Sequence, residues 1–440
     1  FVNENLPHRQ QMLQDASHEK FCHSYVGNFR DSMSGALPLS GNDELPLPYG
    51  ALSSYPLSGC EDGPLKGLTF AVKDVFALKG HVNSYGCPDW KLSHDPSPFT
   101  QAAVLTLLEA GADLKYVALT DELAFSLDGI NAHYGTPLNP ACPERIPGGS
   151  SSGSASLTAG GFVDFALGTD TAGSVRVPAS YCGLYGLRPT HGLIELEGVL
   201  PLGPSFDTVG VLSSTLPVLS SVAEVLLVAS VKSDCAHAGG TASAKLFIEE
   251  RALAYLPPSL RTVFDAEIEG IAKAFKVVER GEGPFDMAEL SRHFAAVRGY
   301  EAWLQHRQWY ETVHPRLSEV VQERLIKCSQ VEESDYLASQ AYRQDLRLRL
   351  QHWFSDGRVL VLPTTCAPAP LLVASSEQLL ENRLKNLDLN ALASVAGLPQ
   401  LTLPRLHVSA GDGNRAPLGL SLVGGVGQDL NLLAIAAELP

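Results

Sequence analysis

Several features that define other classes of protein are missing from these 440 residues. No apolar run reaches the 18 residues that indicate a membrane-spanning helix, so none is expected. Basic residues are not in excess, because 32 Lys and Arg stand against 48 Asp and Glu and give a formal net charge of −16. Nucleic-acid-binding proteins normally present a basic face. We therefore expect neither nucleic acid nor a membrane among the partners.

The cysteines exclude two further classes of protein. The eight cysteines include no Cys-x-x-Cys pair and no cluster with metal-ligand spacing. They are too few for a disulfide scaffold, and a reducing cytoplasm is the default location. We expect no metal and no organic cofactor. The chain begins at Phe1 rather than Met, so the sequence leaves open whether a targeting segment precedes it. A homodimer is compatible with the sequence, which does not determine the oligomeric state.

The texture of the chain changes near residue 65. Residues 1–64 lack a regular hydrophobic pattern and are rich in Gly, Pro, Ser and Leu after residue 27, which predicts an irregular N-terminal extension. Short apolar runs then alternate with helical stretches, a pattern typical of an α/β domain with helices on the faces of its sheet. We expect a single domain over 65–440, with a helix at 101–110 and strands at 68–72, 116–119, 162–168, 358–363 and 419–425.

Residues 257–350 differ from the rest of this domain. They are mostly charged or amphipathic and contain few glycines. Leu317, Val321, Leu325 and Cys328 fall on one face of a helix. We therefore predict a mainly helical insertion in the α/β body.

Two clusters rich in serine and glycine carry the clearest functional signal, PGGSSSGS at 147–154 and GTDTAGSVR at 168–176. A flexible linker is the ordinary interpretation of such runs, but each cluster adjoins an expected strand or helix. A phosphate-binding loop has little support, because GxxxxGK[ST] and GxGxxG are both absent. Residues 149–153 match GxSxG, the nucleophile elbow of α/β-hydrolases, with Ser151 as nucleophile. The preceding NPACPERIP argues against the apolar strand that an elbow requires.

A longer pattern resembles the amidase signature family of hydrolases. PGGSSSGSA is followed by GTDTAGSVRVPASYCGLYGLRP, with Ser150 and Ser174 separated by 24 positions. GLTFAVKD places Lys73 where the family has its catalytic lysine. Further likeness at 131–140, 205–210, 361–365 and 396–424 extends the resemblance over about 65–440. It implies a mixed α/β sheet covered by helices on both faces, with a helical insertion.

The resemblance also implies a mechanism with a Ser-Ser-Lys triad and an acyl-enzyme. Ser174 would attack the amide carbonyl, Ser150 would relay the proton, and Lys73 would be the final base. A serine hydroxyl is a poor nucleophile until a neighbouring group takes its proton. The lysine must therefore be neutral, and burial would lower its pKa toward about 7–8.

The oxyanion hole implied by the resemblance is formed by backbone N–H groups of Thr171, Ala172, Gly173 and Ser174. This turn precedes Pro178, which suits the first turn of a helix. The family usually has Gly-Gly before the nucleophile, whereas this chain has Ala172 in the first of the two positions. If the position needs a positive φ, alanine strains the turn; otherwise its methyl group narrows the pocket.

The remaining candidate residues receive structural interpretations. Asp170 and Arg176 match family positions and are expected to form a buried ion pair that holds the loop. The other interpretations are loop hydrogen bonds for Ser151 and Ser152, packed and hydrogen-bonded histidines at His133 and His191, a small buried hydrophobe at Cys182, and core positions for Trp303 and Trp309.

Within the family, SSSGSA, VRVPASYCG and FDTVG look most like the indole-3-acetamide hydrolases. This likeness implies a small primary amide, preferably an arylacetamide, that is cleaved to a carboxylate and ammonia. Residues 125–140, the helical insertion and 363–370 are expected to form the pocket. Two alternatives stay open: the amidase subunit of a glutamine-dependent amidotransferase, and a non-catalytic amidase-like interaction protein. Against the second, this chain has no repeats and keeps all three residues of the triad.

Overall fold

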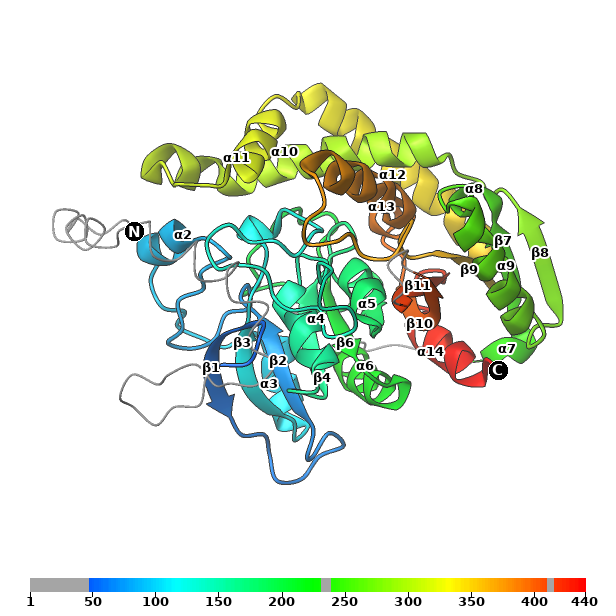
Figure 1. The fold of residues 1–440 in the computed structure, drawn as a ribbon, viewed down its shortest axis with the longest axis horizontal. Coiled ribbons are helices and arrows are strands. Elements are labelled where there is room, and N and C mark those ends of the chain that lie inside the picture. The colour runs from blue at the N-terminus through cyan, green and yellow to red at the C-terminus, as the bar shows by residue number, and fades with distance from the viewer. Residues whose placement is uncertain (1–46, 231–238, 410–414) are drawn as a thin grey trace. The chain divides into compact units, whose positions relative to one another are not determined.

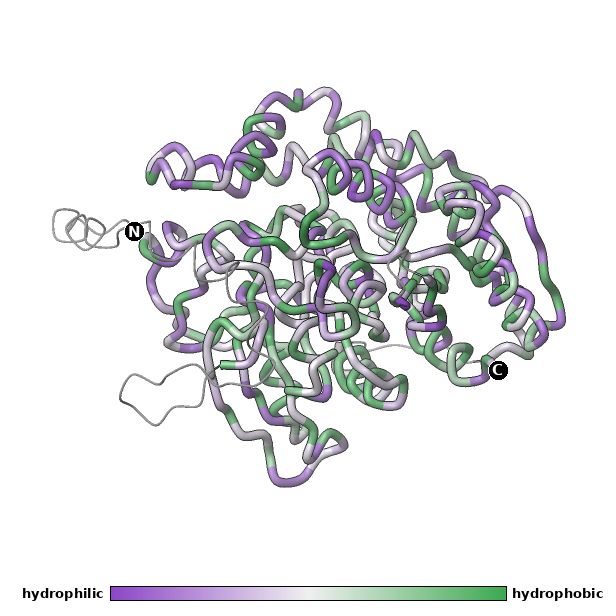
Figure 2. Tube along the Cα trace, in the orientation of Figure 1, coloured by the Kyte–Doolittle hydropathy of each residue, from purple (hydrophilic) through white to green (hydrophobic). Residues whose placement is uncertain are grey.

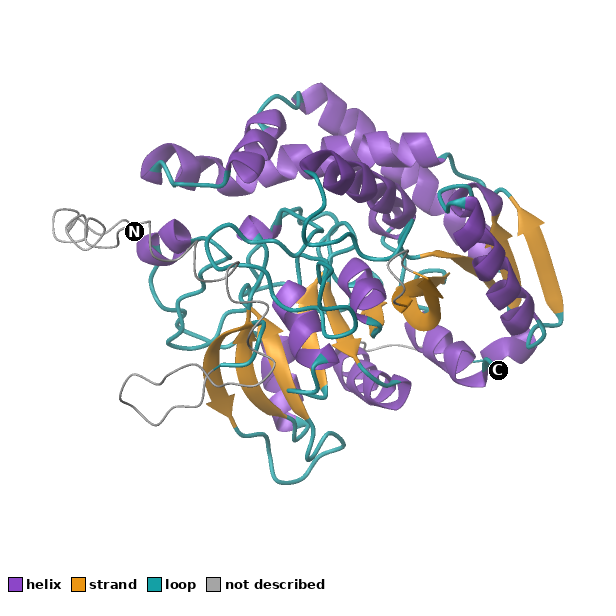
Figure 3. Ribbon diagram, viewed as in Figure 1, coloured by secondary structure: helices purple, strands orange, loops and turns teal. Residues whose placement is uncertain are grey.

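A computed structural model describes residues 47–230, 239–409 and 415–440. In these ranges one 11-stranded sheet has the strand order β1-β3-β2-β4-β6-β5-β10-β11-β9-β7-β8 (Figures 1 and 3). Its strands are β1 (Ala51–Leu57), β2 (Thr69–Lys73), β3 (Asp113–Ala118), β4 (Phe165–Thr169), β5 (Tyr185–Arg188), β6 (Val209–Ser213), β7 (Lys245–Glu249), β8 (Val277–Gly281), β9 (Arg358–Pro363), β10 (Gln400–Ser409) and β11 (Arg415–Val423).

The sheet is mixed, as predicted. β2 runs parallel to β3 and β4, and β7 runs parallel to β8 and β9, whereas the other neighbouring strands are antiparallel. The helices are α2 (Pro88–Ser93), α3 (Ala102–Glu109), η1 (Glu122–Ala124, a 3-10 turn), α4 (Ser152–Ala159), α5 (Arg176–Cys182), α6 (Leu216–Ser230), α7 (Gly240–Ser243), α8 (Glu250–Leu253), α9 (Pro258–Ala272), α10 (Met287–Val313), α11 (Glu319–Cys328), α12 (Glu333–Phe354), α13 (Ser376–Ala396) and α14 (Asp429–Glu438).

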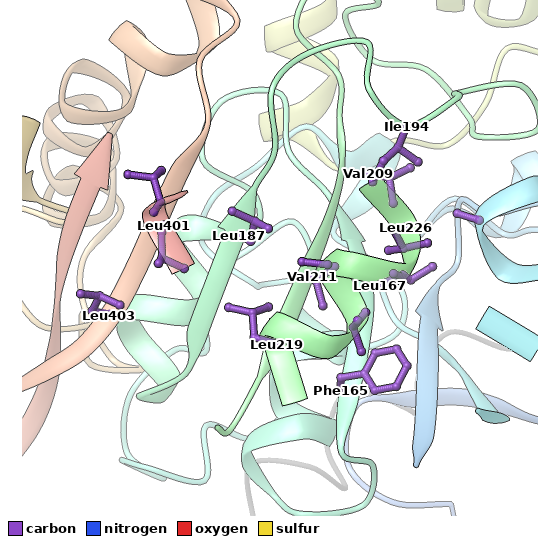
Figure 4. Packing of buried hydrophobic residues seen from close by; sticks show 14 of the residues in the cluster. Phe165, Leu167, Leu187, Ile194, Val209, Val211, Leu219, Leu226, Leu401 and Leu403 are labelled. Carbon is purple, nitrogen blue, oxygen red and sulfur yellow. The ribbon is translucent and has the colours of Figure 1, made fainter. Parts of the chain in front are cut away.

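Alternation along the central strands explains why helices cover both faces of the sheet. Phe165 and Leu167 of β4 belong to the same buried cluster as Leu219 of α6 (Figure 4). Ala166 lies between them and belongs instead to a cluster with Leu157 of α4. Successive side chains of a strand point to opposite faces, so α6 and α4 cover opposite faces of β4.

Small residues bring α4 unusually close to the strands. Its sequence SGSASLTA is almost entirely buried. A Cβ on Gly153 would lie 2.3 Å from the carbonyl oxygen of Gly50 and 2.4 Å from the backbone nitrogen of Leu119. Only glycine permits this backbone approach. The close packing holds the serine cluster that begins the helix against the carboxyl ends of β2 and β4.

The boundary of the sheet differs from the sequence prediction. β1 (Ala51–Leu57) lies within the stretch expected to be irregular and pairs antiparallel with β3, so that expectation was wrong for these residues. β1 is an edge strand, paired on one side and nowhere fully buried. Backbone hydrogen bonds hold such a strand without the alternating apolar pattern that would reveal it in the sequence. The rest of the predicted extension, residues 1–46, lies outside the described residues.

The region predicted as a helical insertion contains α9, α10, α11 and most of α12. Val321, Leu325 and Cys328 are the buried face of α11, as their spacing predicted, whereas Leu317 precedes the helix. Figure 2 shows hydrophilic and hydrophobic residues interspersed along these helices. β8 is an exception inside this region, because it extends the sheet beside β7. Among the described helices, none is both long and apolar enough to cross a bilayer.

Candidate active site

Lys73 is the last residue of β2 and is completely buried. Its Nζ lies 2.8 Å from Ser150 Oγ and 2.8 Å from Thr169 Oγ1. Thr169 ends β4, which runs parallel to β2, so both side chains come from the same edge of the sheet. The sequence analysis gave no role to Thr169. Its position directly after the predicted strand at 162–168, within GTDTAGSVR, could have indicated that it lies at the site.

The two serine clusters meet at this edge of the sheet. The backbone N–H of Ser151 donates to the carbonyl oxygen of Ser174 at 3.2 Å, and the peptide bond between Gly149 and Ser150 is cis. Ser150 is fully buried beside Lys73, whereas Ser174 lines a cavity. The Ser174 hydroxyl makes no hydrogen bond within the described part of the chain. It is therefore the hydroxyl that faces an incoming ligand.

Burial lowers the pKa of Lys73 to about 7, against the opposing effect of the carboxylates of Asp121, Asp207 and Asp170. Water is excluded from the ammonium group, which disfavours its charged form. A substantial fraction of Lys73 is therefore neutral near pH 7 and able to accept a proton. This agrees with the pKa range expected from the sequence.

Asp121 is a second buried titratable group beside the lysine that sequence analysis missed. Its backbone N–H donates to the Ser150 carbonyl oxygen at 3.1 Å, and its Oδ2 accepts from the Gly129 N–H at 2.9 Å. Burial raises the pKa of this carboxyl to about 6. A Cβ on Gly149 would lie 2.2 Å from Asp121 Oδ2, so this glycine lets the carboxylate approach the serine loop.

Asp170 organises the loop that carries Ser174, which confirms its predicted structural role. It accepts hydrogen bonds from the backbone N–H groups of Gly173 at 2.9 Å and Val175 at 3.0 Å. Arg176 pairs with it at 2.7 Å and Arg188 at 3.1 Å, and all three charged side chains are fully buried. Burial alone would raise the pKa of Asp170, but the two guanidinium groups and the backbone donors hold it well below its usual range.

The same contacts revise the predicted oxyanion hole. The Gly173 N–H is already committed to Asp170, so it is not available to an oxyanion. The backbone N–H groups of Thr171, Ala172 and Ser174 have no hydrogen-bond partner among the described residues. Asp207 accepts a hydrogen bond of 2.5 Å from Thr171 Oγ1 and thereby fixes the start of the turn. Three free donors remain beside the nucleophile.

Ala172 does not strain this turn. Gly173 has a φ of 122°, whereas Ala172 is not among the residues with positive φ. Its methyl group lines the cavity beside Ser174. The departure from Gly-Gly therefore narrows the pocket, the second of the two interpretations left open by the sequence.

The cavity at Ser174 is lined by five stretches of the chain, and its volume of about 10 Å³ is close to what a single water molecule needs. The predicted segments 125–140 and 257–350 both contribute, but 363–370 does not; α13 contributes in its place. The lining residues are Ala124, Phe125, Ser126, Leu127, Ala172, Ser174, Leu202, Arg298, Arg383 and Leu387.

The extra serines of the first cluster, Ser151 and Ser152, make loop contacts near the candidate site. Ser151 Oγ donates to the Thr169 carbonyl oxygen at 3.3 Å, as expected for a loop hydrogen bond and unlike an activated nucleophile. The Ser152 hydroxyl is buried without a hydrogen bond of standard geometry in the described chain. It acts on Asp121 by lowering the pKa of that carboxyl.

The other candidates have the structural roles predicted for them. His191 contacts the Pro204 carbonyl oxygen at 2.9 Å. Cys182 is buried, which raises the pKa of its thiol. Trp309 packs in the main core and donates from its indole to Ser93, and Trp303 packs against the same core.

One cluster of potential metal ligands was not foreseen. Cys87, Glu122 and His133 place one ligand atom each within 4.8 Å of one another. His133 Nε2 lies 2.6 Å from Glu122 Oε1, while the backbone N–H and the hydroxyl of Ser318 also bond this carboxylate. Burial raises the pKa of the Cys87 thiol to about 11, which disfavours the thiolate that metals bind. The cluster is best explained as a structural contact, in which Glu122 of η1 accepts hydrogen bonds from Ser318 at the start of α11.

Comparisons with known proteins identify the family of this chain. The sequence profile of the family described as Amidase matches residues 51–248 and 261–433. The chain is 35% identical to Amidase 1 of Oryza sativa subsp. japonica over 404 residues, which cover 86% of this chain and 90% of that protein. It is 33% identical to Translocon at the outer membrane of chloroplasts 64 of Pisum sativum over 390 residues, or 84% of this chain and 65% of that protein.

A solved crystal structure of an amidase has a TM-score of 0.74 and 30% sequence identity, and the match covers 86% of this chain and 85% of that one. The chain therefore belongs to the amidase family, hydrolases that act on carbon–nitrogen bonds. This confirms the family and the fold class expected from the sequence.

Proposed function

We propose that this protein hydrolyses a small primary amide to a carboxylate and ammonia through Ser174, Ser150 and Lys73. The observation that carries the proposal is the contact of 2.8 Å between Lys73 Nζ and Ser150 Oγ in a fully buried setting, one loop away from Ser174. Neutral Lys73 accepts the Ser150 proton while Ser150 accepts the Ser174 proton. The Ser174 oxygen then forms a bond to the amide carbon.

The three free N–H groups of Thr171, Ala172 and Ser174 stabilise the negative oxygen of the tetrahedral intermediate. Removal of one such donor typically costs about 10^2–10^3 in rate. The intermediate collapses to an acyl-enzyme when Lys73 and Ser150 return the proton to the departing nitrogen. Water, deprotonated along the same route, then releases the carboxylate. Catalytic hydrogen bonds often tighten only with substrate, which accounts for the open Ser174 hydroxyl.

An ammonia-release assay over a panel of primary amides tests this proposal. It includes indole-3-acetamide, phenylacetamide, malonamate, glutamine and a fatty amide. Lys73→Ala should abolish release from every amide that the unmodified protein hydrolyses. Unchanged turnover in Lys73→Ala would refute the triad mechanism. Hydroxylamine added to the assay should divert the acyl-enzyme to a hydroxamate.

An arylacetamide is the specific substrate that the family resemblance favours. The apolar side chains of Phe125, Leu127, Leu202 and Leu387 support an apolar or aromatic acyl group. Indole-3-acetamide and phenylacetamide in the panel test this choice against the aliphatic amides.

A role as a non-catalytic interaction protein is the alternative raised by the likeness to the Pisum sativum translocon protein. Lys73, Ser150 and Ser174 are all present, and Lys73 Nζ lies 2.8 Å from Ser150 Oγ, which supports an enzyme. Glutamine hydrolysis that requires added partner subunits would instead indicate an amidotransferase subunit. The cytoplasmic location and the absence of nucleic-acid partners stay predictions.

A further inference from the structure

Two arginines from different helices line the cavity beside Ser174. Arg298 lies on α10 and Arg383 on α13, two helices that pack together (Figure 1). Within the described part of the chain, neither guanidinium forms a hydrogen bond or an ion pair. Arg298 Nε is buried without a partner, and Arg383 is only 9% exposed. Buried charges in proteins are normally paired. These two guanidinium groups are exceptions in the described chain, because neither has a partner there.

The surroundings of this pair are positively charged. Arg298 lies over the rings of Phe125 at 5.4 Å and Phe294 at 5.1 Å, contacts that hold the plane of the guanidinium but not its N–H edge. Burial, with the nearby charge of Arg383, lowers the pKa of Arg298 to about 10. Even so, Arg298 remains cationic at neutral pH.

A third arginine strengthens the positive potential. Arg324 of α11 donates to the Phe125 carbonyl oxygen at 2.6 Å, and its closest approach to a carboxylate is 4.0 Å, to Asp128. Asp128 acts electrostatically on Arg324 and Arg383, and Asp121 acts on Arg324, so the three guanidinium groups outnumber the carboxylates that act on them. A low-dielectric site with this charge attracts an anion.

We propose that the acyl part of the substrate carries a carboxylate, which Arg298 and Arg383 bind while the amide lies at Ser174. This inference rests on the proposed amidase function and specifies its substrate class. Arginine presents a planar set of donors that matches a carboxylate in a bidentate manner. The apolar Leu202 and Leu387 line the same cavity and suit the carbon chain or ring of such an acyl group. Among arylacetamides, one that carries a carboxylate pairs with both cations and should therefore be a better substrate than a neutral one.

Matched pairs of amides test the inference directly. Malonamate is compared with malonamide, succinamate with succinamide, and 4-carboxyphenylacetamide with phenylacetamide. We expect the acidic member of at least one pair to have a kcat/KM at least 100-fold higher than its neutral partner. The preferred pair reports the spacing between the arginines and Ser174. Equal or better turnover of the neutral member in all three pairs would overturn the inference.

Arginine variants assign the preference to the two side chains. Arg298→Met and Arg383→Met should each lower kcat/KM for the preferred acidic amide by about 10- to 100-fold, mainly through KM. Turnover of the neutral partner should stay within a few-fold. Arg307→Met on α10 and Lys385→Met on α13 are matched controls, because both residues are exposed and pair with Glu311 and Glu381. Equal losses on acidic and neutral amides would indicate a structural role instead.

Direct binding separates this inference from the proposed function. Malonate and succinate are titrated calorimetrically into Ser174→Ala, with and without Arg383→Met. Binding that Arg383→Met abolishes supports the anion site even if no amide in the panel is hydrolysed, in which case the proposed function fails alone. Turnover of neutral amides without any dicarboxylate binding would leave the function standing and refute the anion site.

Discussion

Two pairs of arginines near Ser174 differ in how their charges are compensated: Arg176 and Arg188 are fully buried, Arg383 is buried, and Arg298 is partly exposed. Arg176 and Arg188 share the carboxylate of Asp170, and Arg176 also donates to backbone and side-chain oxygens of α13 and β10. Arg298 and Arg383 have no such partner in the described chain. The charges of Arg176 and Arg188 are compensated by Asp170, and these contacts hold the loop that carries Ser174. The charges of the second pair are left available to a ligand.

The difference separates arginines that hold the loop of Ser174 from arginines that can contact a substrate. The paired arginines belong to the loop that positions Ser174 and the free N–H groups, where movement would disturb the reacting atoms. The unpaired arginines belong to helices that wall the cavity, where a substrate can complete their interactions. A buried charge is therefore informative about ligands only after its protein partners have been counted.

Substitution of Ser174, the proposed nucleophile, should have the largest effect on turnover. It should separate the loop that carries Ser174 from the arginines that line the cavity, because only turnover should be lost. Ser174→Ala should lower turnover by at least about 10^4-fold, because catalytic triads lose most of their rate with the nucleophile. Ammonia release measures this loss. Carboxylate binding at Arg298 and Arg383 should survive.

The matched control is Ser151→Ala, which removes a neighbouring hydroxyl bonded to the Thr169 carbonyl oxygen. It should keep most of the activity. The reverse pattern, with Ser151→Ala inactive and Ser174→Ala active, would restore the nucleophile-elbow interpretation.

Loss of the paired charge should affect stability most. Asp170→Asn leaves Arg176 and Arg188 buried with reduced compensation, which should cost about 3–5 kcal/mol of unfolding free energy. Urea denaturation followed by circular dichroism measures the change. Arg383→Met removes an unpaired charge and should alter stability by less than about 1 kcal/mol or increase it. Similar destabilisation by both substitutions would break the distinction between the two pairs.

The pH dependence should report the charges around Lys73. Only the neutral amine can accept a proton, so kcat/KM should rise with pH and level off above an apparent pKa near 7. Asp121→Asn removes a negative charge that stabilises the protonated amine, so the pKa of Lys73 should fall and the rising limb should move to lower pH. A stopped assay of ammonia release measures both profiles. The assay covers about pH 5–9, which extends about two pH units on either side of the expected pKa of Lys73.

Movement of the limb to higher pH in Asp121→Asn would contradict this assignment. Asp345→Asn is the control, because this exposed carboxylate pairs with Arg349 on α12 and should leave the profile unchanged.

The smallest expected effect concerns the turn beside the nucleophile. Ala172→Gly should lower stability by about 0.4–1 kcal/mol, because glycine gains freedom in the unfolded chain and Ala172 is unstrained. Loss of the Ala172 methyl group also widens the cavity, so bulkier acyl groups should gain in kcat/KM relative to small ones. Differential scanning calorimetry and a series of acyl groups measure the two effects. A clear stabilisation would show that alanine strains the turn after all.

Particular residues show how far the sequence could be interpreted. Lys73, Ser150 and Ser174 were predicted because each stands in a local motif at family spacing, and Asp170 and Arg176 because they match family positions. Asp121 was missed because it belongs to no recognised motif, although it follows a predicted strand next to β2. Thr169 lies in GTDTAGSVR but was given no role there. The roles given to the triad remain predictions that the substitutions above test.

The sequence by itself determined the family and the alternation of strands and helices, and it singled out the candidate residues for amide chemistry, because these depend on local patterns and on motifs. Only the tertiary structure decided that the Gly173 N–H is occupied, that β1 joins the sheet edge, and that Arg298 and Arg383 meet at Ser174 without a carboxylate. These facts depend on which groups become neighbours when distant segments pack. The free energy of a buried charge is set by those neighbours, and local sequence does not contain them.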